Sequence, residues 1–333
     1  MATDIYVNAE TGNDTTGTGA SDFPYLHISR ALEDVTDPIT DVTTIHLQAT
    51  SEPYTETSGD ISLQGLRCYG REAKLVIEAD GWQESLYEAM QEPFAGSGIF
   101  DITAAKPVQL NMKLIFIDCA EVELRGLGFG TIDADLWTHL DVQGSSRVVA
   151  KYCRFEEIAY PVILTGPVTA LFEMCYFTHN MTAILAQSGA TATLGGDNEI
   201  VDVMVRGLHA LDRSAFIVKP WQYAETKAFT TTIQSTVPLK NEYNAVRLER
   251  LSALSLPGNA ASAEPSFTGV LVIDNAYAKL YETYYGVKLL SKSLLIDADQ
   301  IRFTMRNTKG ETVEMPEDQQ IVATEEEDTT ITY

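Results

Sequence analysis

The chain of 333 residues carries 23 Lys and Arg against 47 Asp and Glu, which gives a net charge of −24. Phosphate groups would be repelled by such a surface, so nucleic acids and anionic membranes are excluded as expected partners. A hydrophobic content of 45% is ample for a buried core and excludes wholesale disorder. The apolar runs are too short to cross a membrane.

The N-terminal region predicts a short strand, a loop and one helix. Residues 5–8 are strand-like, and residues 9–22 are rich in Gly, Thr, Asp and Asn, as loops are. Apolar residues recur at helical spacing over residues 28–35, which predicts an amphipathic helix. No basic stretch followed by an apolar run precedes them, so we expect no signal peptide and a protein made in a cytoplasm.

Farther along, apolar or small residues recur at the first, third, sixth and eighth positions of short stretches. Two strands with inward residues two apart, joined by a bend that takes up one extra residue, account for these offsets, whereas a helix does not. The best copies lie 22 residues apart, as in a repeat protein. The pattern predicts a parallel β-helix, a solenoid of short strands, whose open N-terminal end the helix over 28–35 is expected to cover. The copies are Ile61/Leu63/Leu66/Cys68, Val122/Leu124/Leu127/Phe129, Val148/Ala150/Cys153/Phe155, Ala170/Phe172/Cys175/Phe177 and Val246/Leu248/Leu251/Ala253.

The inward positions of these copies predict one continuous core, with Phe155 and Phe177 as neighbours on adjacent coils. Between residues 192 and 221 the 22-residue step would bury Asp197 and Lys219, so we infer a register slip of one residue there. The expected core includes Val122, Leu124, Phe129, Val148, Phe155, Phe172, Phe177, Val246 and Leu248. Cysteines match or adjoin inward positions and show no CxxC spacing, so we expect free thiols and no metal at Cys68, Cys119, Cys153 and Cys175.

Three segments follow from these patterns. Residues 1–40 form the initial strand, loop and capping helix, residues 41–305 form the β-helix, and residues 306–333 form an acidic tail. Residues 80–98 and 256–268 break the period and are expected to be lateral loops. The tail contains alternating stretches suited to strand pairing, so we expect a homotrimer whose interface includes residues 306–333.

The N-terminal sequence DIYVNAETGNDTTGTGASDFPYLHISRALEDV resembles the first segment of right-handed parallel β-helix proteins of the pectate-lyase-like group. Bacteriophage tailspikes and tail-associated proteins belong to that group. The resemblance rests on Tyr6-Val7-Asn8, Gly12-Asn13-Asp14, the Gly17/Gly19 pair, Pro24 and the residues from Ile28 to Leu32. It implies an all-β, right-handed, single-stranded parallel β-helix with an N-terminal capping helix. It implies little about function, because this fold hosts lyases, hydrolases, adhesins and spacers.

Candidate catalytic residues are expected where carboxylates lie on neighbouring coils, as glycoside hydrolysis requires. A step of 22 residues places Lys151 over Glu173 and Glu157 over His179, and no carboxylate over a carboxylate, which argues against a hydrolase. A lyase needs a Lys or Arg base beside carboxylates, and the nearest approach is Lys151 with Glu173, together with Asp118 and Asp141. The competing interpretation is a surface salt-bridge ladder.

Aromatic residues near loops and strand edges could stack on sugar rings. The candidates are Trp82, Trp137, Trp221 and Tyr284, although core packing or a subunit interface is the more common role of such residues.

The favoured function is a structural or host-attachment component of a bacteriophage-like particle, tail-associated and without catalytic activity. The expected partners are further copies of the chain, other particle proteins and a host surface glycan, and no cofactor is expected. The alternative is a glycan-cleaving hydrolase or lyase of the tailspike kind, with Asp118, Asp141, Glu173 and Lys151 as its catalytic candidates.

Overall fold

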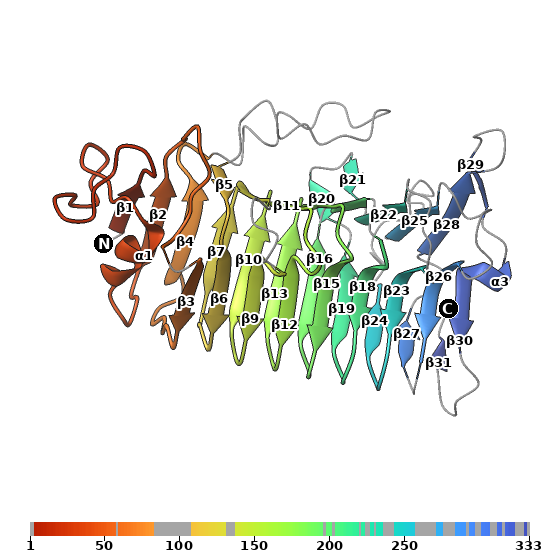
Figure 1. Ribbon diagram of the computed structural model, residues 1–333. Helices are drawn as coiled ribbons and strands as arrows, with labels where there is room; N and C mark the ends of the chain where they lie inside the picture. The colour runs from red at the N-terminus through yellow and green to blue at the C-terminus, as the bar shows by residue number, and fades with distance from the viewer. Residues whose placement is uncertain are drawn as a thin grey trace.

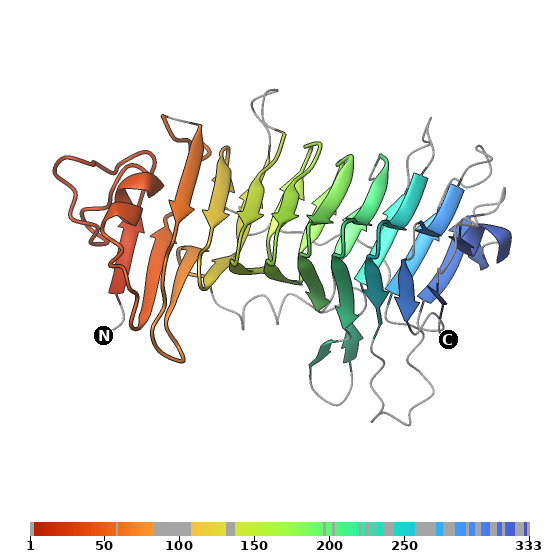
Figure 2. The same ribbon diagram turned by 90° about the horizontal axis from the view of Figure 1, so that it is seen from below.

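Short strands wind around one axis and form three long sheets that run from the N-terminal to the C-terminal end of the molecule (Figures 1 and 2). The pairing within these sheets is parallel, apart from the last strand of one sheet. The computed structural model describes residues 3–57, 59–82, 108–130, 137–195, 198–201, 204–219, 221–223, 227–229, 231–235, 243–256, 271–275, 284–290, 293–296, 301–306, 312–314, 317–323 and 330–331.

Within each sheet, the strands lie side by side in the order in which the chain forms them. Sheet 1 contains β1 (Thr3–Val7), β2 (Val42–Leu47), β4 (Lys74–Ala79), β7 (Val122–Arg125), β10 (Arg147–Lys151), β13 (Thr169–Glu173), β16 (Thr191–Gly195), β19 (Ala215–Lys219), β24 (Ala253–Ser255), β27 (Leu294–Ile296) and β31 (Thr330–Ile331). Sheet 2 contains β5 (Val108–Leu110), β8 (Leu127–Phe129), β11 (Arg154–Glu156), β14 (Tyr176–Thr178), β17 (Glu199–Val201), β22 (Thr231–Ser235), β25 (Leu271–Asn275), β28 (Ile301–Arg306) and the antiparallel β29 (Thr312–Glu314). Sheet 3 contains β3 (Asp60–Gln64), β6 (Lys113–Ile117), β9 (Leu140–Gln143), β12 (Val162–Thr165), β15 (Thr182–Gln187), β18 (Arg206–Ala210), β23 (Tyr243–Leu248), β26 (Tyr284–Leu289) and β30 (Ile321–Ala323). The remaining elements are a hairpin of β20 (Trp221–Tyr223) and β21 (Lys227–Phe229), and the helices α1 (Ile28–Glu33) and α3 (Glu317–Gln320).

The predicted parallel β-helix is confirmed. A central coil passes from sheet 3 to sheet 1, then to sheet 2, and returns to sheet 3, as β9, β10, β11 and β12 do. Phe155 pairs in register with Phe177, and their rings stack with centroids 4.9 Å apart. All nine predicted core residues are at most 1% exposed, so side chains two apart on each strand do fill one interior.

The bend between sheet 1 and sheet 2 is the one that the spacing predicts. Gly126 alone separates β7 from β8, and its φ of 64° lies in the left-handed region. On the next two coils Tyr152 and Met174 adopt the same conformation, with φ of 54° and 56°. A residue with a Cβ loses about 1–2 kcal/mol there, so the packing of the two flanking strands must offset this strain.

The inferred register slip is also present. Phe177 pairs with Ile200, one residue beyond the 22-residue step, and Asn198 occupies the bend in a fully buried position. The Asn198 side chain accepts a hydrogen bond from the Cys175 N–H and donates to the Phe172 carbonyl, so these two backbone groups are paired in the buried bend.

Two proposed inward positions of one copy are wrong. Leu251 is 52% exposed, and on β24 the buried residue is Leu254 and not Ala253. The stretch from Val246 to Ala253 crosses from β23 in sheet 3 to β24 in sheet 1 and turns there over four residues. Its apolar spacing matches the other copies, but its corner is a different one.

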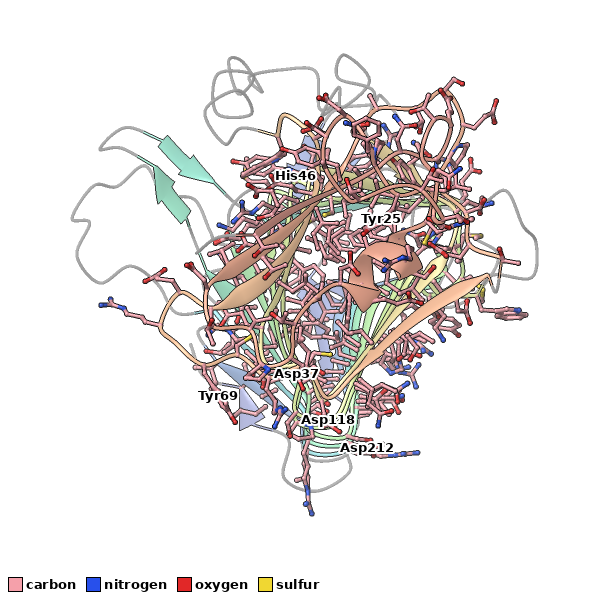
Figure 3. The ribbon with its side chains drawn as sticks, turned by 90° about the vertical axis from the view of Figure 1, so that its left-hand side faces the viewer. Tyr25, Asp37, His46, Tyr69, Asp118 and Asp212 are labelled. Carbon is pink, nitrogen blue, oxygen red and sulfur yellow. The ribbon has the colours of Figure 1, made fainter. Side chains whose placement is uncertain are left out.

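The N-terminal helix forms within the predicted range as α1. Ile28 and Ala31 are buried in the core cluster, and the Glu56 carboxylate accepts hydrogen bonds from the N–H groups of Ile28 and Ser29. Figure 3, which views the molecule along its axis from this end, shows α1 near the middle of the cross-section.

The segment boundaries expected at residues 41 and 306 do not coincide with sheet boundaries. β1 is the first strand of sheet 1, and the last strands of sheets 1 and 3 are β31 and β30, which pair in parallel with β27 and β26. The C-terminal segment therefore adds to the sheets of its own chain. The lateral loops expected at 80–98 and 256–268 lie almost wholly outside the described residues. Within the described part of the chain, no helix is long and apolar enough to span a membrane.

Candidate functional site

A row of charged side chains crosses the outer face of sheet 1. The inward residues Val122, Leu124 and Ala150 lie in the core, so the residues next to them on β7 and β10 point outward. We call this row the charged ladder; it consists of Lys74, Glu78, Glu123, Arg125, Lys151 and Glu173.

Contacts within the ladder run from coil to coil. The Arg125 guanidinium lies 3.1 Å from a Glu78 oxygen and 2.8 Å from a Glu123 oxygen. The Lys151 Nζ lies 3.7 Å from Glu123 Oε1 and 3.3 Å from Glu173 Oε2. Lys151 thus joins two carboxylates on strands either side of its own.

Glu123 is the most enclosed member of the ladder, with 6% of its side chain exposed. Burial would raise the pKa of Glu123, but hydrogen bonds from Arg125 and Lys74 outweigh burial and lower it to about 2. The carboxylate therefore stays ionised throughout the neutral range. Glu78 and Asp4 extend the row to His46, and hydrogen bonding to Glu78 raises the pKa of His46 despite its burial.

An indole ring adjoins the ladder. The Arg125 guanidinium lies 5.1 Å from the Trp82 ring centroid, and Trp82 also contacts the Tyr152 ring at 5.9 Å. Trp82 is partly buried against the core, so part of its surface stays accessible.

Two of the four predicted catalytic residues meet in this site and two do not. Lys151 and Glu173 are in register and in contact, as predicted. Asp141 lies on β9 of sheet 3, where it pairs with Lys113 at 2.9 Å. Asp118 occupies the bend after β6 and accepts a hydrogen bond from the Ser145 N–H.

The predicted glycan-contact aromatics are also separated. Trp82 is at the ladder, whereas Trp137 is 67% exposed just before β9. Trp221 and Tyr284 lie on β20 and β26, and their side chains are outside the described residues.

Sequence reasoning missed Glu123. The step from β7 to β10 is 26 residues, because Val122 pairs with Val148, so a 22-residue step compares the wrong positions. The signal that could have revealed Glu123 is local: it stands between two inward residues of one repeat copy and must therefore point outward beside Arg125.

The sequence matches no family model and no curated protein. Among solved structures, it is similar in fold to a pectin methylesterase from Erwinia chrysanthemi (12% identity, 100% of this chain and 94% of that chain, TM-score 0.33). It is also similar to a rhamnogalacturonan lyase (12%, 99% and 84%, TM-score 0.27). A third is a lacto-N-biosidase from Eubacterium ramulus (10%, 98% and 67%, TM-score 0.27).

These likenesses correct one prediction. The expectation that the chain is not an enzyme is contradicted, since the three structures are named for an esterase, a lyase and a biosidase. None of the three is named for a bacteriophage.

Proposed function

We propose that the protein is a glycan-cleaving enzyme whose substrate binds along the charged ladder of sheet 1. The observation that supports this most directly is the pair of carboxylates, Glu123 and Glu173, on either side of Lys151. The ladder crosses several coils, so an extended sugar chain could contact it over its length.

The geometry of this pair suits hydrolysis. The contacts of 3.3 and 3.7 Å to Lys151 Nζ limit the two carboxylate oxygens to a separation of about 7 Å at most, and glycoside hydrolases use carboxyl pairs about 5–9.5 Å apart. Glu123 is ionised, so it is suited to stabilise positive charge that develops on a sugar ring. Glu173, with 27% of its side chain exposed, is assigned as the proton donor.

The neighbouring groups have supporting roles. Arg125 and Lys74 hold the Glu123 carboxylate in place through their hydrogen bonds. Trp82, beside Arg125, offers an aromatic face on which a sugar ring can stack.

The test is incubation of the full chain with a panel of bacterial surface polysaccharides, measured as release of reducing ends. One polysaccharide should be cleaved, and Glu123→Gln and Glu173→Gln should each lower the rate at least 100-fold. Asp141→Asn is the matched control, because it also neutralises an ion-paired carboxylate on an outer sheet face but away from the ladder. The proposal fails if no polysaccharide is cleaved, or if both glutamine variants keep the rate of the unmodified chain.

A lyase is the second candidate, and Lys151 favours it. The Lys151 ammonium group, held between two carboxylates, can pair with the carboxylate of a uronate, and the Glu173 carboxylate can then accept the proton next to that group. Cleavage would then produce unsaturated uronates that absorb in the ultraviolet, and Lys151→Ala would abolish it. Reducing ends without this absorbance identify the hydrolase.

The homotrimer, the association with a bacteriophage-like particle and the host glycan as a partner remain predictions. A glycan-cleaving tailspike is the form of the proposed enzyme that is consistent with them.

A further inference from the structure

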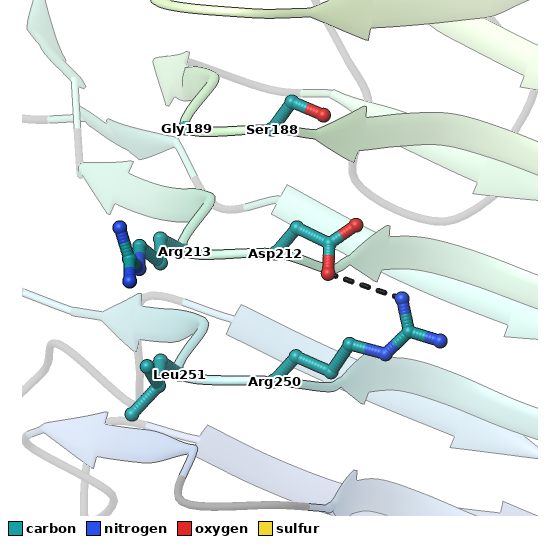
Figure 4. A pocket seen from close by; sticks show the side chains of 6 residues that line it. All are labelled: Ser188, Gly189, Asp212, Arg213, Arg250 and Leu251. Atoms are coloured by element: carbon teal, nitrogen blue, oxygen red, sulfur yellow. Dashed lines mark hydrogen bonds and ion pairs between the residues drawn. The ribbon is translucent and has the colours of Figure 1, made fainter.

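A pocket of about 550 Å³ lies at the corner between sheet 3 and sheet 1 (Figure 4). It spans three successive coils, at the bends that follow β15, β18 and β23. It is lined by Ser188, Gly189, Asp212, Arg213, Arg250 and Leu251.

The backbone at these bends is unfavourable for the residues it carries. Asp212 and Arg213 have φ of 56° and 66°, and Arg250 and Leu251 have φ of 54° and 65°. Glycine adopts this left-handed region without steric cost, and Gly189 stands at the position of the previous coil that aligns with Arg213. Large side chains are therefore present where glycine would cost least, as Tyr152 and Met174 are at other bends.

The charges at the pocket differ from those of the whole chain. Arg250 donates a hydrogen bond to Asp212 at 3.1 Å, which fixes both side chains. Within the described part of the chain, no carboxylate forms an ion pair with Arg213. Two arginines and one aspartate give the pocket a charge of +1 on a chain of −24, so an anion finds an attractive site there.

Figure 4 shows how the groups are arranged. Arg213 and Leu251 project on one side of the bends, from adjacent coils, while the Asp212–Arg250 pair lies on the other side. The Leu251 side chain is 52% exposed and provides an apolar surface next to a guanidinium. Ser188 and Asp212 add a hydroxyl group and a carboxylate that can bind hydroxyl groups of a ligand.

We propose that this pocket binds an anionic, hydroxylated molecule of the size of a monosaccharide. Arg213 would form paired hydrogen bonds to its carboxylate or phosphate group, as guanidinium groups do with planar anions. Asp212 and Ser188 would bind its hydroxyl groups, and Leu251 would pack on its carbon skeleton. The site is separate from the charged ladder: Figure 3 shows Asp212 at the corner that also carries Asp118, on the opposite side of the cross-section from His46.

The experiment titrates the full chain with glucuronate, glucose 6-phosphate and glucose, and follows the arginine side-chain signals by NMR together with calorimetry. At least one of the two anions should bind saturably, and at least tenfold more tightly than glucose. Glucuronate and glucose 6-phosphate distinguish a carboxylate from a phosphate ligand. Absence of saturable binding by both anions, or equal binding of glucose, overturns the proposal.

Two variants locate the site. Arg213→Gly removes the guanidinium and relieves the left-handed strain, so the protein should fold at least as well as before and bind the anion at least tenfold more weakly. Arg71→Gln removes an arginine whose side chain is 96% exposed and does not line the pocket, and it should leave binding unchanged. Undiminished binding by a folded Arg213→Gly protein overturns the assignment. Polysaccharide cleavage is not part of the readout, so this test and that of the proposed enzyme can fail independently.

Discussion

Replacing Phe155 with alanine would remove the middle ring of a three-ring column in the core. Phe155 stacks on Phe129 at 4.8 Å and on Phe177 at 4.9 Å, with interplanar angles of 5° and 9°. All three rings are at most 1% exposed. Because the strands on both sides are held by parallel pairing, the interior has little freedom to collapse into the space left behind.

The expected loss of unfolding free energy for Phe155→Ala is about 3–5 kcal/mol, the range for a buried phenylalanine that leaves a cavity. Aromatic pairing contributes about 0.5–1.5 kcal/mol per pair beyond buried area. Phe155 makes two such pairs, so Phe155→Leu, which keeps most of the volume but no ring, should cost about 1–3 kcal/mol.

Urea unfolding of the three proteins, followed by circular dichroism, measures both values. Hydrogen exchange should show reduced protection of the backbone amides on β8, β11 and β14, which belong to the mutated coil and its neighbours, because a repeat interacts mainly with adjacent repeats. A cost below about 1 kcal/mol for Phe155→Ala would refute the reasoning. If Phe155→Ala and Phe155→Leu lowered the free energy of unfolding equally, the contribution assigned to ring stacking would be refuted.

Three further outcomes are expected. Burial lowers the pKa of His139 to about 4, so the folded state resists protonation below pH 6.5 and loses stability as pH falls from there toward 4. A shift of one pKa unit corresponds to about 1.4 kcal/mol, so His139→Leu should reduce the loss of unfolding free energy between pH 7.5 and pH 4.5 by about 2–3 kcal/mol. An unchanged loss would contradict this. Cys119, Cys153 and Cys175 are buried free thiols, so a thiol reagent should label them only after unfolding, and a disulfide detected by mass would contradict this. The Glu123 carboxylate, whose pKa is lowered from 4.5 to about 2, should lose its stabilising contribution progressively as pH falls from about 4.5 to about 2, and Glu123→Gln should abolish that loss in urea titrations.

The buried positions that stack from coil to coil could be predicted from the sequence, because inward and outward residues alternate strictly along each strand. Phe129, Phe155 and Phe177 were placed correctly, since one bend residue between two short strands leaves only one way to direct all the apolar side chains inward. Leu251 was misplaced because the same apolar offsets also arise across another corner, where the bend is longer. Apolar spacing identifies a coil but not the corner that it crosses.

The candidate site was predicted only in part, for a reason that concerns coil length. Lys151 and Glu173 lie on coils separated by the regular 22-residue step, so their contact followed from the period. Glu123 and Lys151 lie on coils separated by a 26-residue step, which the period could not foresee. To predict contacts between coils of unequal length, the lengths of the turns must be known, and the pattern of inward residues does not give these lengths.

The unequal coils have a consequence for protein design. The step between paired inward residues is 22 from Phe155 to Phe177, 23 from Phe177 to Ile200 and 24 from Ala192 to Phe216, yet all of these residues remain fully buried. Extra residues are accommodated at the corners while the interior keeps its alignment. Foreign peptides grafted into the turns between sheet 2 and sheet 3 should therefore be tolerated, and successive grafts would stand about 4.8 Å apart along the shaft, the spacing of paired strands. The spacing of the coils would thus fix the distance between epitopes or binding loops displayed on the protein.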